Sequence, residues 1–198
     1  LSTAAGCDSI VITNIETAGI ELQLNVSDLT LELGETLLLQ ATSSLSTDPA
    51  FSWSPAEAFS CSDCPNPVFL PLQSGIYTLT GIDQPSGCTD SISFNVEVLS
   101  CTKVFIPNVF SPNQDGVNDR FQVFTKSCYS NIREIRIFDR WGGLVYEAFD
   151  QVPNLATGLW DGKIAGKVAP AGIYVYTITL EVLDGSIQQQ SGEVLVVY

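Results

Sequence analysis

The chain has 198 residues, with 8 basic and 22 acidic side chains, a net charge of −14, and neither histidine nor methionine. This acidic balance repels phosphate backbones and anionic lipids, which excludes nucleic-acid binding and electrostatic membrane docking. Without histidine the chain lacks the commonest general base and a common zinc ligand, which argues against most enzyme classes. The missing methionine predicts that the chain is the C-terminal piece of a longer protein.

Cysteine content and hydropathy indicate the compartment. Six cysteines in a chain rich in Ser, Thr and Gly are typical of an exported, oxidised protein. A continuous apolar run of roughly 18 residues is absent, so no membrane span is predicted. The first residues contain no basic region followed by an apolar stretch, so they are not a signal peptide.

The N-terminal segment has an internal counterpart. Residues 6–16 are similar to residues 87–97 apart from one inserted residue. Because 87–97 is expected to be the closing strand of a sandwich, the tail 1–18 is interpreted as the closing strand of a preceding repeat.

Apolar and polar residues alternate along most of the chain, and 3.6-residue periodicity is not found. In the first half the alternation covers Ile20–Val26, Leu29–Leu33 and Ile92–Val98, with a turn at Gly34–Glu35. Side chains on a strand point alternately to its two faces, so each segment predicts a strand with one buried face.

The second half ends in a predicted hairpin. Tyr174–Val182 alternates strictly, and Asp184–Gly185 joins it to the segment Ile187–Tyr198. A domain boundary is expected at Leu99–Lys103. The fold class is therefore all-β, with two tandem immunoglobulin-like β-sandwich domains at residues 19–99 and 101–198.

The cysteines are expected to form structural disulfides. Cys101 and Cys128 bracket the start of the second domain and most simply pair with each other. Cys61 lies in a loop rich in Pro and Ser and is predicted to pair with either Cys64 or Cys88. Cys7 is left to pair with Cys88 or with a cysteine of a preceding module. Zinc is disfavoured, because a second Cys-x-x-Cys and histidine are both missing.

Four Asn or Asp side chains surround a glycine between Ser111 and Asp119. They are Asn113, Asp115, Asn118 and Asp119. Hard cations bind several oxygen ligands on a tight turn, so calcium is a candidate cofactor here and no other cofactor is expected. The alternative is a loop of Asx turns in which the side chains bond their own backbone while Gly116 adopts a positive φ.

Two tryptophans lie next to glycines in predicted turns, Trp141 before Gly142 and Trp160 before Asp161–Gly162. Exposed tryptophan rings stack on sugars, which is the usual basis of carbohydrate binding. The favoured interpretation is structural, with both rings covering the sandwich core at hairpin ends.

Four segments of the second predicted domain resemble, in their order and spacing, the gliding-motility-associated C-terminal domain of Bacteroidetes proteins. They are Val104–Asp119, Ile135–Gly142, Leu159–Gly162 and Ala169–Tyr176. The chain has Gln114 where the family often has glycine, and it ends in Tyr198 where many members end in a basic residue.

The resemblance implies a type B C-terminal sorting domain of the type IX secretion system. Such domains direct a large exported protein across the outer membrane, in partnership with PorP/SprF-type outer-membrane proteins, for release or display on the cell surface. The first predicted domain resembles the PKD/immunoglobulin-like modules that often precede this signal. The segments that carry this likeness are Phe51–Pro55, Cys61–Pro65, Ile76–Thr80 and Gly87–Asp90.

We therefore predict a monomeric, non-enzymatic sorting signal that the secretion machinery recognises through one loop and through a sheet edge at the terminal strand. The predicted recognition residues are Asn113, Asp115, Gly116, Asn118, Asp119, Glu193, Val194, Leu195, Val196, Val197 and Tyr198. One alternative is a cell-surface adhesin or carbohydrate-binding module that uses Trp53 or the loop 59–67. A hydrolase built from Asp, Glu or Ser is a further alternative.

Overall fold

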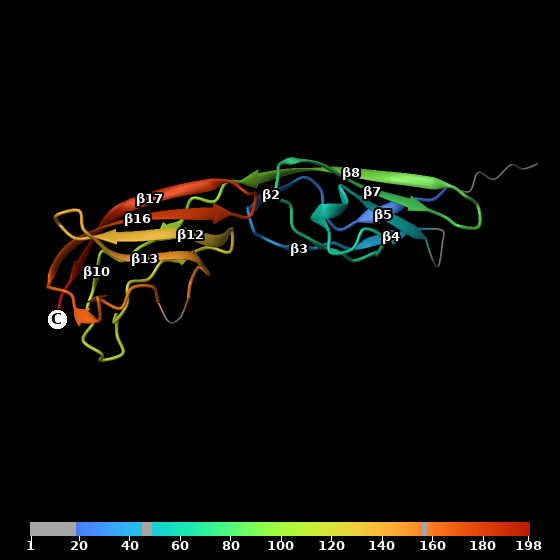
Figure 1. The fold of residues 1–198 in the computed structure, drawn as a ribbon. Helices are drawn as coiled ribbons and strands as arrows, with labels where there is room; N and C mark the ends of the chain where they lie inside the picture. The colour runs from blue at the N-terminus through green and yellow to red at the C-terminus, as the bar shows by residue number, and fades with distance from the viewer. Residues whose placement is uncertain (1–18, 45–48, 156–157) are drawn as a thin grey trace, which may run out of the picture.

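The computed structural model describes residues 19–44, 49–155 and 158–198. Apart from one 3-10 turn at Ala56–Ala58, the regular structure in these ranges is entirely β, so the predicted all-β class is confirmed. Figure 1 shows two β-sandwiches arranged end to end. The tail 1–18, with Cys7 and the first copy of the similar segment, lies outside the described residues.

The first sandwich is formed by the strands before residue 100. These are β1 (Leu22–Leu24), β2 (Leu29–Glu32), β3 (Leu37–Leu38), β4 (Ala41–Ser43), β5 (Ala50–Ser54), β6 (Val68–Phe69), β7 (Gly75–Ile82) and β8 (Thr89–Leu99). One layer is a sheet in the order β2-β8-β7-β5, in which β2 runs parallel to β8. The antiparallel pairs β1–β4 and β3–β6 contribute to the same core.

The second sandwich is formed by the strands after residue 100. These are β9 (Val104–Phe105), β10 (Val109–Phe110), β11 (Phe124–Thr125), β12 (Tyr129–Phe138), β13 (Leu144–Gln151), β14 (Lys163–Ile164), β15 (Lys167–Val168), β16 (Gly172–Val182) and β17 (Ile187–Val196). Its main sheet has the order β10-β17-β16-β12-β13. Strand β10 runs parallel to β17, and the other neighbours are antiparallel.

The alternation in the sequence explains which face of each long strand is buried. On β16 every second side chain from Tyr174 to Val182 is buried, as predicted. The hairpin between β16 and β17 also forms as predicted, with Gly185 at a φ of 83°. Burial of these apolar side chains provides the main stabilising contribution to the sandwich.

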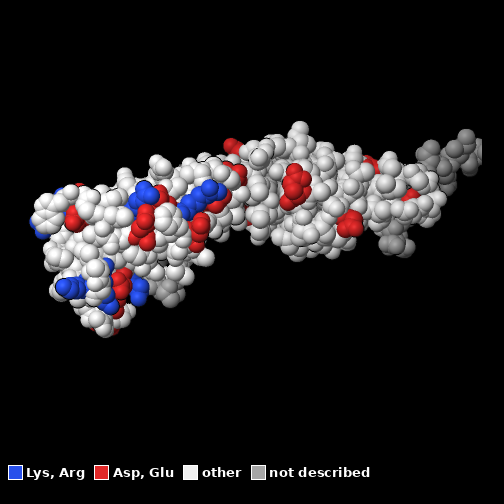
Figure 2. Space-filling view, in the orientation of Figure 1, with Lys and Arg blue, Asp and Glu red and all other residues white. Residues whose placement is uncertain are grey.

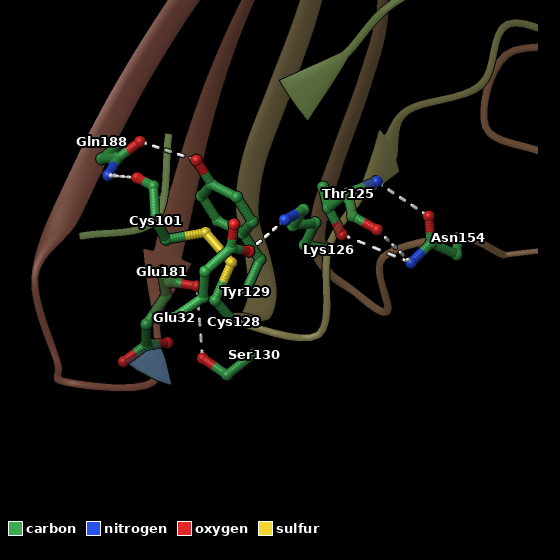
Figure 3. The surroundings of a disulfide bond; sticks show 10 residues. All are labelled: Glu32, Cys101, Thr125, Lys126, Cys128, Tyr129, Ser130, Asn154, Glu181 and Gln188. Carbon is green, nitrogen blue, oxygen red and sulfur yellow. Dashed lines mark hydrogen bonds and ion pairs between the residues drawn. A yellow bond between two sulfur atoms is a disulfide. The ribbon is translucent and has the colours of Figure 1, made fainter. Parts of the chain in front are cut away.

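The two sandwiches are in direct contact at their junction. Leu33, which follows β2, is buried in the core of the second sandwich. A Cβ atom on Gly34 would lie 3.0 Å from the backbone nitrogen of Cys128, so only glycine fits there without displacement. Glu32 forms an ion pair with Lys126 of the second sandwich (Figure 3).

A disulfide strengthens the second sandwich beside this junction. It joins Cys101, at the start of the sandwich, to Cys128, which precedes β12. The Gln188 side chain donates to the Cys101 carbonyl over 2.9 Å and accepts from the Tyr129 hydroxyl over 2.8 Å (Figure 3). The segment before β9, the start of β12 and the start of β17 are therefore connected at one point.

The ion pair at the junction predicts a pH dependence. Lys126 donates a hydrogen bond to Glu32, and its positive charge adds to the effect, so the pKa of Glu32 lies below its ordinary value of 4.5. A lowered folded-state pKa stabilises the protein above the unfolded pKa, and the contribution is lost as the pH falls through the folded pKa. We expect Glu32→Gln to melt at a lower temperature than wild type at pH 7.

The same comparison at low pH provides the control. Once Glu32 is protonated, the wild type and Glu32→Gln should melt at the same temperature, because neither forms the ion pair. Melting curves from pH 7 to pH 3 test this expectation. A difference in melting temperature that did not depend on pH would contradict it.

Candidate recognition surface

The predicted recognition loop is organised by its own side chains. Asp119 accepts hydrogen bonds from the backbone nitrogens of Gln114, over 2.6 Å, and Gly116, over 2.8 Å. Asp115 accepts from the backbone nitrogen of Val117 over 2.8 Å and from the side-chain amide of Asn113 over 3.0 Å. Such Asx-type bonds close a tight loop without a regular element.

Three residues of the loop have positive φ angles. They are Gln114 at 67°, Gly116 at 87° and Asn118 at 53°. Asparagine and glycine tolerate this region well, whereas glutamine does so less readily. The described residues contain no group of three or more His, Cys, Asp or Glu side chains that would hold a metal ion.

The loop packs against the turn at 159–163, which contains the motif Trp160–Gly162. Pro112, Gln114 and Asp119 line a cavity of about 280 Å³ together with Asp161 and Lys163. The backbones that follow the loop and precede the turn are paired, because the Phe121 nitrogen donates to the Trp160 carbonyl over 2.9 Å and the Leu159 nitrogen donates to the Phe121 carbonyl over 2.8 Å. The loop and the turn at 159–163 thus form one continuous surface.

Gly162 allows this close approach. It has a φ of 69°, and a Cβ atom there would lie 2.4 Å from Cγ of the rigid Pro112 ring. We expect Gly162→Ala to lower the free energy of unfolding by about 2–3 kcal/mol, from left-handed backbone strain and from displacement of the loop. Urea denaturation measures this loss.

Gly116→Ala is the matched control for that variant. Gly116 also has a positive φ, of 87°, but a Cβ atom there would meet no neighbour within 4 Å. Its expected loss is therefore only the backbone strain, about 1–2 kcal/mol. Equal losses in the two variants would contradict a close contact between Gly162 and Pro112.

The terminal strand combines buried and exposed positions. Val194 and Val196 are fully buried core residues, whereas Glu193, Leu195 and Tyr198 are exposed. The Tyr198 hydroxyl donates to the Ala169 carbonyl over 2.6 Å, and burial raises the pKa of this hydroxyl. It therefore remains protonated, and a donor, at neutral pH.

The prediction of a free sheet edge at residues 193–198 is wrong at Leu195 and Val197, whose outward backbone nitrogens are already paired. The Leu195 nitrogen donates to the Asn108 carbonyl over 2.8 Å, and the Val197 nitrogen donates to the Phe110 carbonyl over 3.1 Å. Strand β10 therefore covers the outer side of β17 at its end, and no incoming strand can pair there. Two residues of β10 are too few to give a recognisable pattern in the sequence.

A comparison with known families identifies the second sandwich. Residues 104–196 match the family model described as CHU_C Type IX secretion signal domain. The second sandwich is a type IX secretion signal domain. Such domains mark proteins that are exported to the cell surface or the medium, and the secretion machinery recognises them. A signal domain of this kind on a sandwich fold points to a non-catalytic module.

The similar solved structures are distant. Latent PorU from Porphyromonas gingivalis is 17% identical, with 91% of this chain and 20% of the PorU chain covered and a TM-score of 0.33. A titin fragment, I67–I69, is 12% identical, with 91% and 66% covered and a TM-score of 0.34. SGBP-B of Bacteroides ovatus, solved with a mixed-linkage heptasaccharide, is 15% identical, with 92% and 48% covered and a TM-score of 0.33.

No curated protein matches the sequence. The chain spans one fifth of the PorU chain and about two thirds of the titin fragment. Within the ranges that the structure describes, no helix is long and apolar enough to cross a membrane.

The tryptophans differ from one another in a way that the sequence did not indicate. Trp160 of the secretion signal domain is fully buried, as expected, and its Nε1 donates to the Lys163 carbonyl over 2.9 Å. Trp141 was expected to cover the core but is 80% exposed, with the Arg140 guanidinium 4.7 Å from its ring centre. Trp53 is only 2% exposed, so the prediction that it contacts a sugar on the first sandwich is wrong.

The charged residues are distributed unevenly between the two sandwiches, a signal that the sequence itself contains. All eight basic residues lie after residue 100, with ten of the 22 acidic ones, whereas residues 1–100 carry acidic residues only. On the visible face Figure 2 accordingly shows blue side chains over the secretion signal domain alone. The signal domain is nearly neutral, and the first sandwich is purely anionic.

Proposed function

We propose that residues 101–198 form an address read by a PorP/SprF-type outer-membrane protein, and that residues 19–99 form a spacer between this address and an exported cargo. The match of residues 104–196 to the type IX secretion signal family carries the proposal. The joined surface of the 113–119 loop and the 159–163 turn supports it, because self-bonded loops on a rigid sandwich present fixed side chains to a partner. The signal acts as a monomer.

A fusion experiment tests this address. A reporter protein that is directed to the periplasm is joined to the N-terminus of the whole chain, in a host with a type IX secretion system. We expect the reporter on the cell surface or in the medium. A fusion that ends at residue 100 is the control and should stay in the periplasm, and retention of the whole-chain fusion there would overturn the proposal.

The identity of the reader is tested in the same host. The PorP/SprF-type proteins of the host are deleted one at a time. Deletion of the one that reads this signal should block export of the fusion while other cargo still leaves the cell. If the fusion is exported from every deletion strain, the machinery recognises the signal domain through a different protein.

Binding of carbohydrate is the alternative function, and one observation favours a site other than Trp53. The exposed Trp141 ring and the Arg140 side chain lie beside a cavity of about 100 Å³ that also contacts Tyr174. A glycan array with the whole chain tests this alternative. Binding that Trp141→Ala abolishes would support an adhesin, whereas we expect no binding from a pure address.

Calcium at Asn113, Asp115, Asn118 and Asp119 is the remaining ligand to test. The carboxylates of Asp115 and Asp119 already accept hydrogen bonds from within the loop, which supports a loop that closes without a metal. We expect millimolar calcium to leave the melting temperature unchanged. A ligand that binds only the native state raises this temperature, so an increase of several degrees would support calcium binding.

A further inference from the structure

The outer edge of β17 is open before β10 begins to cover it. The backbone nitrogens of Leu195 and Val197 point outward, because both donate to the segment that contains β10. Backbone direction alternates along an antiparallel strand, so the nitrogens of Gln189, Ser191 and Glu193 point outward as well. None of these three nitrogens has a hydrogen-bond partner among the described residues.

On the equivalent edge of the first sandwich, two of the outward nitrogens are capped by side chains. Its strand β8 also lies beside a short parallel strand, β2, which pairs with residues 96–99. Beyond that pairing, the Asn95 nitrogen donates to the carboxylate of Asp28 over 2.8 Å, and the Ser91 nitrogen donates to that of Asp90 over 2.8 Å. Capping by side chains is one way in which proteins stop unwanted strand pairing.

The other edge of the signal-domain sheet is irregular. Strand β13 opposes a bulge between Ile137 and Phe138, and Asp150 on it has a φ of 50°. The Gln151 side chain also donates to the Phe149 carbonyl over 2.6 Å. By contrast β17 contains no residue with a positive φ, and its pairing with β16 shows no register shift. The edge of β17 is therefore the regular, uncapped one.

We propose that the β17 edge from Gln189 to Glu193 receives an extended, positively charged segment of another protein as an added strand. This rests on the proposed function, in which the secretion machinery binds this domain, and it assigns the backbone groups that would make the contact. Strand addition supplies main-chain hydrogen bonds, and the neighbouring side chains select the sequence. Charge selects the class of partner: β17 carries one acidic residue, Glu193, and no lysine or arginine, so its edge attracts a cationic segment, while the net charge of −14 repels a second copy of the whole chain.

The two faces next to this edge define the side chains that the added strand should carry. The face of the sheet away from the core carries a polar hollow of about 360 Å³, bordered by Thr177, Thr179, Gln189 and Glu134. On the core side, Tyr176 packs directly over Gly192, so closely that a Cβ atom there would lie 2.4 Å from its hydroxyl. The added strand should therefore alternate between polar residues on the face with the hollow and apolar residues on the core side, where they contact Tyr176.

A peptide experiment tests the edge without any secretion machinery. The probe is the peptide Lys-Val-Thr-Val-Thr-Val-Lys, added to the whole ¹⁵N-labelled chain. We expect amide hydrogen exchange at Gln189, Ser191 and Glu193 to slow by about tenfold or more, because pairing protects amides from solvent. Unchanged exchange at all three amides over the whole peptide titration would overturn the proposal.

Two variants show whether the contact is made by strand pairing. Ser191→Pro removes an outward nitrogen that makes no bond to β16, so the sheet should persist while protection by the peptide is lost. Ser191→Lys keeps the nitrogen and places a positive charge beside the lysine-bearing probe, so it covers the case in which the proline variant does not fold. Ser93→Pro on β8 is the matched control and should leave protection at the β17 edge unchanged.

Export of the reporter fusion separates the two proposals. With the wild-type fusion on the surface, Ser191→Pro or Ser191→Lys should reduce its export by about tenfold, and Ser93→Pro should not. Normal export of both Ser191 variants would overturn strand addition and leave the address intact. If the wild-type fusion is retained in the periplasm, the address fails, and the peptide experiment still decides whether the edge binds strands. A concentration-dependent dimer in sedimentation that Ser191→Pro abolishes would identify the occupant as a second copy and overturn the proposed one.

Discussion

Replacement of Trp160 by alanine is expected to lower the free energy of unfolding of the secretion signal domain by about 3–5 kcal/mol. The ring is fully buried and makes edge contacts with Phe110, at a centroid distance of 5.4 Å, and with Tyr174, at 5.0 Å. Its loss leaves a large cavity and removes the donor to the Lys163 carbonyl, which is then left without that bond. Because Trp160 supports the 159–163 turn, the recognition surface should loosen as well.

Trp141→Ala is the control for this substitution. The two variants remove the same side chain, but Trp141 is 80% exposed, so its expected effect lies within about 0.5 kcal/mol. Urea denaturation followed by far-ultraviolet circular dichroism measures both. Similar losses in Trp141→Ala and Trp160→Ala would contradict the burial of Trp160, and exported Trp160→Ala fusions at wild-type levels would show that the turn is not needed for recognition.

Removal of the disulfide between Cys101 and Cys128 is expected to cost about 3–4 kcal/mol. The bond closes a loop with a sequence separation of 27, and such a cross-link limits the conformational freedom of the unfolded chain. Both cysteines are also buried in the core of the signal domain. The variant to measure is Cys101→Ala with Cys128→Ala, by urea denaturation under oxidising conditions.

The disulfide between Cys61 and Cys64 provides the comparison. It closes a sequence separation of only 3, so its removal by a pair of alanines should cost about 2 kcal/mol in the first sandwich. A reducing agent should destabilise the wild-type signal domain and leave the Cys101→Ala, Cys128→Ala variant unchanged. An equal response of the wild type and this variant would show that the buried bond adds no stability.

Local patterns in the sequence were sufficient for long alternating strands such as β16, but not for the two-residue strands or for the pairing of strands with one another. The alternation from Tyr174 to Val182 predicted the buried face and the last residue of β16, because the side-chain period of a strand is set by its backbone. The parallel pairing of β10 with β17 was not predictable, because it joins residues 109–110 to residues 195–196. For that reason the sequence predicts an open edge at residues 193–198, whereas the outward nitrogens without partners among the described residues are those of Gln189, Ser191 and Glu193.

In the candidate site, too, local hydrogen bonds could be predicted from the sequence and tertiary contacts could not. Hydrogen bonds within the loop from Asn113 to Asp119 follow from the preference of Asn and Asp for bonding the nearby backbone, which is a local property. Its contact with Gly162 depends on the packing of the whole sandwich and has no local signal. Trp141 and Trp160 also look alike in sequence, since each lies in a turn near glycine, and only the tertiary fold separates the exposed ring from the buried one.

The position of β17 inside its sheet links the address to completion of protein synthesis. This strand is the last one of the domain to leave the ribosome, yet it lies between β10 and β16. A chain that stops before residue 187 lacks β17. Strands β10 and β16 then have no strand between them with which to pair. We expect that prematurely terminated products never display the folded address, so that export is reserved for chains that were translated to this point.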